Sequence, residues 1–264
     1  IAAKAFASLF WGSHPYGHWL MGTEGSLQAM TPEELRRFHG ERWRPGGAAL
    51  VVVGDVEAAR LRSLLETAFA AWPAGAPEAA PAPAAPAVAR RAVLVEKAGA
   101  PQTFVMMGMP GMARSDPDYA AAEVAFQILG GGTASRLFRH LREEKGYTYS
   151  TYARADARKL GGSSMVVGSV KAAQTREALS ALLAEVEALR REPVSPRELE
   201  DARSALVLSL PSDFATAAGI AGRLAEQVVH GLPDDYWERY AEAVRRVTAA
   251  DVLRVARRDL DPSR

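Results

Sequence analysis

Apolar and polar positions alternate along the first part of the chain in patterns typical of both helices and strands. Amphipathic helices are predicted at residues 1–10, 31–42 and 57–72. Thr31 and Pro32 supply an N-cap and a first-turn proline to the second of these helices. The apolar, β-branched run 48–53 ends at Gly54 and Asp55, which indicates a buried strand followed by a turn.

The later part of the chain predicts a mixed run of strands and helices, followed by helices alone. Strands are expected at residues 92–96, 103–109, 148–155 and 163–170, and helices at 117–129, 134–142, 174–191, 196–208 and 213–229, with two shorter helices after Pro233. A mixed run followed by helices able to cover one face of a sheet is typical of an α+β layered domain. We therefore predict an α+β fold.

The stretch between these two parts consists almost wholly of alanine and proline, with prolines at 73, 77, 81, 83 and 86. Such a composition favours extended polyproline geometry and acts as a semi-rigid spacer. We therefore predict part of a first domain in residues 1–73, a linker in 74–91 and a second domain in 92–264.

Composition and charge narrow the classes of function. The chain is 48% hydrophobic and 24% charged, with a formal net charge of +1, so nothing indicates a partner such as nucleic acid or an anionic membrane. There is no cysteine, which excludes disulfides, thiolate metal sites and a cysteine nucleophile. No apolar run approaches the length of a membrane span.

His14 and His18 are four residues apart, a spacing at which two histidines on a helix share a metal ion. Pro15 and Gly17 disfavour that helix, and no glutamate lies between the histidines to act as a base. A structured loop of turn residues is favoured over a zinc site.

Gly130, Gly131 and Gly132 precede a predicted helix, where exposed amides could hold a phosphate. No Lys-Ser/Thr pair follows at P-loop spacing and no dinucleotide fingerprint continues, so a tight turn between helices is favoured. A Gly-x-Ser-x-Gly nucleophile elbow is also absent from the sequence.

The most informative stretch, Leu129 to Ala153, predicts a helix that ends in a charged turn and leads into a strand. This order places Arg142 near the helix end and Tyr149 at the opening of the strand, so that both can point toward one cavity. Their donors suit a peptide carbonyl or negative charge developing on it. An arginine that complements a helix end and a half-buried tyrosine remain a purely structural alternative.

In this stretch the sequence resembles the insulinase-type zinc metallopeptidases, especially their processing-peptidase branch. The resemblance lies in the glycine turn, Ser135 to Phe138, Leu141-Arg142-Glu143 and Gly146 to Ser150, and in the earlier motifs His14 to His18, Gly22-Thr23-Glu24, Phe38-His39, Trp43-Arg44-Pro45 and Val51 to Asp55. The resemblance implies two related α+β domains, each an antiparallel-rich sheet covered by helices. Residues 1–73 would be the C-terminal half of the first, incomplete domain.

The family binds zinc through an inverted His-x-x-Glu-His motif in one domain, and an Arg and a Tyr of the opposing domain contact the substrate. By this resemblance Arg142 and Tyr149 are the substrate-binding residues. His-x-x-Glu-His does not occur in the sequence, so we expect no catalytic or metal-binding residue in this chain and no activity from the chain alone. Zinc would belong to a missing N-terminal half or to a separate catalytic subunit.

Two functions follow from the resemblance. The first is the substrate-binding part of a zinc metalloendopeptidase that acts on peptides or unfolded polypeptides. The alternative is a metal-free subunit that binds peptides or scaffolds an assembly. In both cases residues before Pro73 supply only part of a sheet, so we expect apolar surface there and, with it, self-association or partial disorder.

Overall fold

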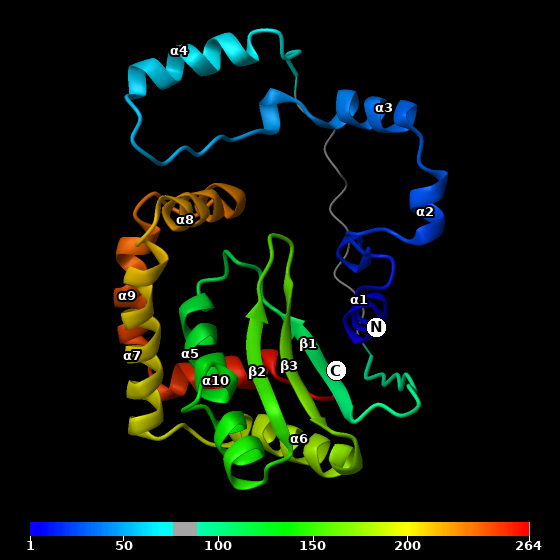
Figure 1. Cartoon of the computed structure of the whole chain (residues 1–264). Coiled ribbons are helices and arrows are strands. Elements are labelled where there is room, and N and C mark those ends of the chain that lie inside the picture. Colours follow the sequence, from blue (N-terminus) through cyan, green and yellow to red (C-terminus); the bar gives the residue numbers. More distant parts are fainter. Residues whose placement is uncertain (76–88, 264) are drawn as a thin grey trace. The chain divides into compact units, whose positions relative to one another are not determined.

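The computed structural model of the chain describes residues 1–75 and 89–263 (Figure 1). The chain forms two compact units, each assembled from segments that are distant in sequence. The first comprises Ile1–His18, Ala84–Leu210 and His230–Arg264, and the second comprises Trp19–Pro83 and Pro211–Val229. The domain boundaries expected at residues 73 and 92 rest on the alanine- and proline-rich composition of the stretch between them, and they stay a prediction.

The first unit contains a three-stranded antiparallel sheet in the order β1-β3-β2. Its strands are β1 (Gln102–Gly111), β2 (Thr148–Asp156) and β3 (Gly162–Lys171). β2 and β3 form a hairpin, and Gly161 in its turn has φ +115°, a backbone conformation that side chains with a Cβ rarely adopt. β1 and β2 are the two edge strands, so only β3 is paired on both sides.

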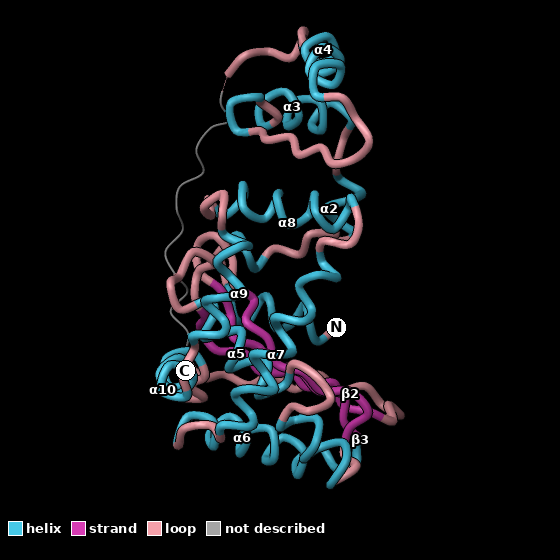
Figure 2. The backbone as a smooth tube through the Cα atoms, turned by 90° about the vertical axis from the view of Figure 1, so that its left-hand side faces the viewer, coloured by secondary structure: helices cyan, strands magenta, loops and turns pink. Residues whose placement is uncertain are grey.

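Helices of the core cover one face of this sheet, and the first helix, Ala2–Trp11, packs on the other face, where a Cβ on Gly108 of β1 would lie 2.2 Å from the Phe6 ring. The helices of this unit are α1 (Ala2–Trp11), α5 (Tyr119–Gly130), a π-helix (Phe138–Glu144), α6 (Thr175–Arg191), α7 (Pro196–Asp213, of which the part to Leu210 belongs here), α9 (Tyr236–Arg246) and α10 (Ala249–Asp259). Figures 1 and 2 show α6 alongside β2 and β3.

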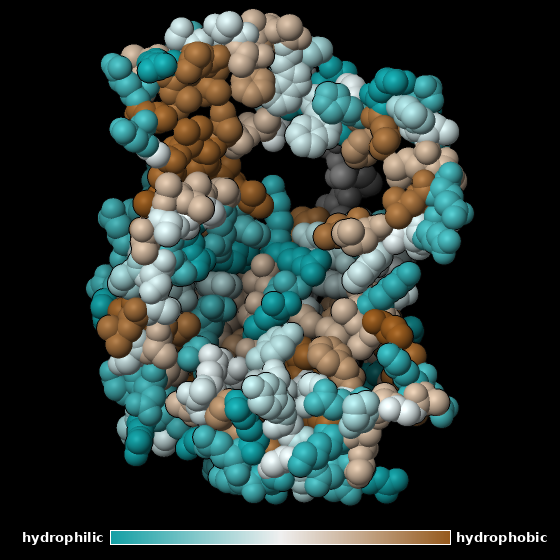
Figure 3. All heavy atoms as spheres, viewed as in Figure 1, coloured by the Kyte–Doolittle hydropathy of each residue, from teal (hydrophilic) through white to brown (hydrophobic). Residues whose placement is uncertain are grey.

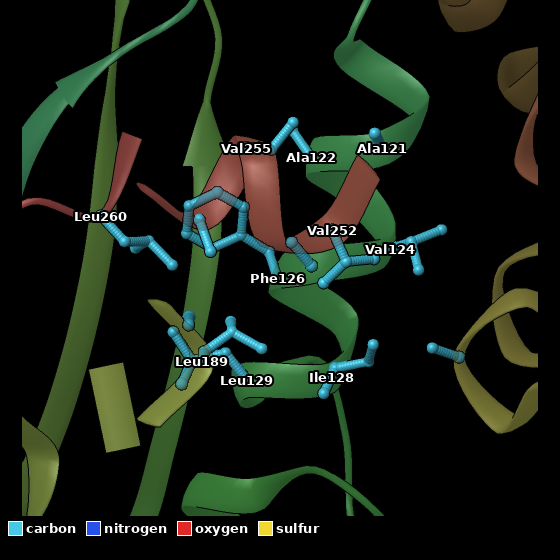
Figure 4. Packing of buried hydrophobic residues seen from close by; sticks show 14 of the residues in the cluster. Ala121, Ala122, Val124, Phe126, Ile128, Leu129, Leu189, Val252, Val255 and Leu260 are labelled. Atoms are coloured by element: carbon cyan, nitrogen blue, oxygen red, sulfur yellow. The ribbon is translucent and has the colours of Figure 1, made fainter. Parts of the chain in front are cut away.

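The core of the first unit lies between the sheet and α5, α6 and α10. Figure 4 shows Phe126, Leu129, Leu189 and Leu260 pointing toward one another from these elements. Leu129, Leu189 and Leu260 are fully buried, and burying a leucine contributes about 1.5 to 3 kcal/mol. This packing holds the strands that carry the candidate site.

The second unit consists of short helices with little core. They are α2 (Glu24–Ala29), α3 (Pro32–Arg42), α4 (Ala58–Phe69) and α8 (Ala217–His230, of which the part to Val229 belongs here). Among its described residues Gln227 alone is buried, while Phe38, Trp43 and Leu64 are more than half exposed. Figure 3 shows apolar side chains gathered at the surface beside α4. The apolar surface expected before Pro73 is therefore present.

Most predicted elements are found within a few residues of their expected ends. The α+β class, with an antiparallel sheet covered by helices, is confirmed. The strands expected at 48–53 and 92–96 are wrong, because a strand requires a ladder of hydrogen bonds and no ladder in the described ranges includes either run. The proline-rich stretch 76–88 lies outside the described residues.

Within residues 1–75 and 89–263, no single helix has the length and apolar composition needed to cross a membrane. α7 and α8 meet that test only as a bent pair, by length and composition.

Candidate functional site

Arg142 and Tyr149 come together on one surface of the first unit. The guanidinium carbon of Arg142 lies 4.9 Å from the centroid of the Tyr149 ring and 4.6 Å from that of Phe138, so the cation rests against two aromatic faces. Tyr149 is 75% exposed and Arg142 is also exposed. The pair therefore presents its donors on an open face rather than inside an enclosed cavity.

Arg142 belongs to the π-helix Phe138–Glu144, where the sequence predicted an ordinary helix. The amide of Lys145 donates to the carbonyl of His140 at 3.1 Å, which closes the wider π-type turn. Nδ1 of His140 lies 2.5 Å from a carboxylate oxygen of Glu185 and so fixes this turn to α6. π-helices are rare in proteins, and those that occur often lie at functional sites. This local geometry therefore supports a functional role for Arg142.

A β-bulge sets the direction of Tyr149. The register between β2 and β3 shifts between Thr148 and Ser150, so the regular alternation of β2 is interrupted at Tyr149. The Thr148 hydroxyl braces the bulge, because it accepts from the Ser150 amide at 3.1 Å and its proton can reach the Ser169 carbonyl at 2.5 Å. Bulges commonly re-aim a side chain near a functional site.

We predict that Thr148→Val lowers the free energy of unfolding by about 1 kcal/mol, because the part-buried backbone groups of Ser150 and Ser169 lose their hydroxyl partner. The substitution should also change the orientation of the Tyr149 ring, since the bulge loses its brace. Urea denaturation and near-UV circular dichroism measure the two effects. Thr148→Ser keeps the hydroxyl and should preserve both properties; equal losses in the two variants would contradict this role of the hydroxyl.

An ion pair fixes the start of the segment that carries Arg142. Arg136 donates to both carboxylate oxygens of Glu198, from Nε at 2.7 Å and from Nη2 at 3.2 Å. Ser195 donates to the same carboxylate from its amide at 3.0 Å and its hydroxyl at 2.8 Å. Burial raises the pKa of Glu198, but the hydrogen bonds from Arg136 and Ser195 outweigh burial and lower this pKa to about 2.

The residues described here do not fit the zinc that the resemblance implies. Nδ1 of the buried His14 accepts the Tyr16 amide at 3.0 Å, and His18 is exposed beyond the intervening 3₁₀ turn. Among the described residues no group of three or more His, Cys, Asp or Glu side chains could hold a metal ion. No zinc chemistry is assigned to this chain.

The glycine triplet makes a close-packed turn against the site. A Cβ on Gly130 would lie 2.3 Å from the Ala153 amide nitrogen, so α5 approaches β2 closely because this residue lacks a side chain. The hydroxyl of Ser135 donates to the Gly132 carbonyl at 2.5 Å, which closes the turn from within. These contacts support a tight turn that positions β2.

Two exposed side chains of β2, Tyr152 and Arg154, extend the surface beyond the predicted pair. The guanidinium carbon of Arg154 lies 5.9 Å from the centroid of the Tyr152 ring. The sequence analysis did not single out either residue. Their period-two spacing within a predicted strand is the signal that could have found them.

The fold of the first unit defines an α+β domain with an antiparallel sheet covered by helices. The family model described as Peptidase M16 inactive domain matches residues 29–206, and the chain belongs to this family. This confirms the resemblance to the insulinase-type zinc metallopeptidases.

Two relatives and one solved structure are similar to this chain in sequence or in fold. An uncharacterized zinc protease of Streptomyces coelicolor is 34% identical over 154 residues, which cover 56% of this chain and 33% of the relative. A non-peptidase homolog of Helicobacter pylori is 21% identical over 239 residues, covering 90% of this chain and 55% of the relative. The crystal structure of a peptidase M16 inactive domain from Pseudomonas fluorescens superposes with a TM-score of 0.88 at 28% identity, covering 99% of this chain and 62% of that one.

The chain thus spans between a third and about three fifths of the length of these similar proteins. Their names include both a zinc protease and a non-peptidase.

Proposed function

We propose that this chain is the substrate-binding part of a zinc metalloendopeptidase that acts on peptides or unfolded polypeptides, with the zinc ligands on another segment or a partner subunit. The observation that carries the proposal is the Arg142–Tyr149 pair, with 4.9 Å between guanidinium carbon and ring centroid on an exposed surface. The guanidinium supplies several donors and the phenol supplies one, a set that matches the carbonyl oxygens of a peptide. The substrate-binding role of Arg142 and Tyr149 is part of this proposal.

The surroundings of the pair support binding over a purely structural role. Among the described residues, no hydrogen bond or ion pair occupies the Arg142 guanidinium, whose contacts are the rings of Phe138 and Tyr149. Arg136, on the same segment, is instead committed to Glu198 by two hydrogen bonds. A structural arginine is expected to look like Arg136, whereas Arg142 keeps its donors available.

We predict that Arg142→Ala weakens the binding of an unstructured peptide about tenfold or more, because a hydrogen bond from a charged donor contributes about 1.5 to 3 kcal/mol. Tyr149→Phe should weaken binding about threefold to tenfold through loss of one neutral hydrogen bond. Fluorescence anisotropy with a labelled peptide measures both affinities.

Matched controls are available in the same unit. Arg176, an exposed residue of α6, and Tyr147, two positions before Tyr149, should tolerate Arg176→Ala and Tyr147→Phe with little change in affinity. The same variants can then be mixed with the catalytic partner chain and zinc. Cleavage that appears only in the mixture and falls in the Arg142 and Tyr149 variants would support the proposal, and unchanged binding and cleavage would refute it.

The second candidate function is a metal-free subunit that binds peptides or scaffolds an assembly. The name of the Helicobacter pylori relative, a non-peptidase homolog, favours it. The exposed apolar side chains of the second unit support a partner chain or self-association in either case. Peptide binding without cleavage in any mixture would favour this second function.

A further inference from the structure

We propose that Arg154, together with Tyr152, extends the peptide-binding surface along β2 and gives it a preference for an acidic side chain in the peptide. This inference rests on the proposed function of the Arg142–Tyr149 pair. Arg142 and Tyr149 bind backbone carbonyl groups, which every peptide has. Arg154 adds a contact with one side chain of the peptide and so selects among peptides.

The register of the sheet places Tyr152 and Arg154 on one face. Tyr152 lies opposite Val167 and Arg154 lies opposite Met165 on β3, and alternate residues of a strand share a face. Ala153, between them, points to the other face, where a Cβ on Gly130 of α5 would come within 2.9 Å of the Ala153 Cβ. Tyr152 and Arg154 therefore point away from α5, toward the outer face of the sheet.

The charge of Arg154 is not neutralised locally. Within residues 1–75 and 89–263 its guanidinium makes no hydrogen bond or ion pair, and its contact is the Tyr152 ring. Arg158, on the same hairpin, donates to one carboxylate oxygen of Asp156 from two nitrogens, at 3.0 and 2.7 Å. Of these two arginines of the hairpin, Arg158 is neutralised by Asp156. The guanidinium of Arg154 is available to bind a carboxylate of a peptide.

The distance between Tyr149 and Arg154 along β2 predicts where in a bound peptide the acidic residue should lie. Arg154 follows Tyr149 by five residues, and β-strands rise about 3.3 Å per residue, so the two contacts lie about 16 to 17 Å apart. An extended peptide running along β2 covers that span in about four or five residues. The preference should therefore be strongest for an acidic side chain four or five positions from the residue held by Arg142 and Tyr149.

The experiment compares unstructured peptides that carry Glu, Gln or Lys at a single position, with that position moved along the peptide. We expect the wild-type chain to bind the Glu peptide about fivefold more tightly than the Gln peptide at the favoured position, and the Lys peptide more weakly than either. Arg154→Gln should remove the difference in affinity between the Glu and Gln peptides. Arg154→Glu should reverse the order in favour of Lys.

Arg176→Glu is the matched control, since it makes the same charge change at an exposed arginine of α6 and should keep the preference for Glu. Far-UV circular dichroism verifies the folding of each variant. A wild-type chain that binds peptides but treats Glu and Lys alike, or an Arg154→Glu variant that keeps the original order, would overturn the inference. A wild-type chain that binds none of the peptides would instead refute the proposed function on which the inference rests.

Discussion

Glu198→Gln is expected to lower the free energy of unfolding by about 2 to 3 kcal/mol at neutral pH. Removing one partner of a buried ion pair costs about 3 to 5 kcal/mol, because the other charge stays buried without compensation. The side chain of Arg136 is 12% exposed and that of Glu198 is 22% exposed, so solvent relieves part of this cost. The substitution also weakens the contact of Ser195 with the carboxylate at the start of α7.

The pH dependence of this effect has a definite sign. The folded chain holds the pKa of Glu198 at about 2, below the ordinary value of 4.5, so its stabilisation is fully present above about pH 4.5 and is lost as the pH falls toward 2. The difference in unfolding free energy between the wild type and Glu198→Gln should therefore be largest at pH 7 and should shrink between pH 4.5 and 2.

Urea denaturation at pH 7, 4.5 and 3 measures this difference. Glu200→Gln is the control on the same helix: the Glu200 side chain is 67% exposed and reaches Arg203 only at 3.6 Å, so the change should stay within about 0.5 kcal/mol. A Glu198→Gln variant as stable as the control at pH 7 would show that the ion pair does not fix this segment.

Local signals in the sequence predicted helices well and isolated strands poorly. Thr31 and Pro32 predicted the start of α3, and the structure forms the complete capping box between Thr31 and Glu34. The run 48–53 has strand composition, yet a strand also needs a neighbouring strand, which local composition does not specify. Helix caps are encoded within four residues, whereas ladders depend on distant segments.

For the candidate site too, the sequence predicted the features that depend on local order and missed those that depend on distant segments. The order of a helix end followed by a strand predicted that Arg142 and Tyr149 would point toward one cavity, and the structure instead places them on an open face, with 4.9 Å between the guanidinium carbon and the ring centroid. The π-helix and the bulge that orient them were not predicted, because both depend on packing against α6 and β3. The Arg136–Glu198 pair joins positions 62 residues apart, and no periodicity of one sequence indicates it.

Gly130→Ala is expected to destabilise the chain by about 2 kcal/mol, although helix propensity alone predicts the opposite sign. Alanine stabilises a helical position by up to about 1 kcal/mol relative to glycine. The new Cβ would, however, lie 2.3 Å from the Ala153 nitrogen and 2.8 Å from the Tyr152 carbonyl carbon, both in the backbone of β2. Backbone atoms cannot rotate away as a side chain does, so the overlap should outweigh the propensity gain.

Gly132→Ala provides a matched control within the same turn, because the nearest atom to its new Cβ is Nε2 of Gln127 at 3.7 Å, an ordinary contact. Urea denaturation should give a loss for Gly130→Ala and a change within about 0.5 kcal/mol for Gly132→Ala. Because β2 carries Tyr149, Tyr152 and Arg154, the shift that Gly130→Ala forces on the strand should also reduce peptide affinity, while Gly132→Ala should leave it unchanged. If Gly130→Ala raised the stability of the chain, helix propensity would dominate and the close approach of α5 to β2 would not position the site.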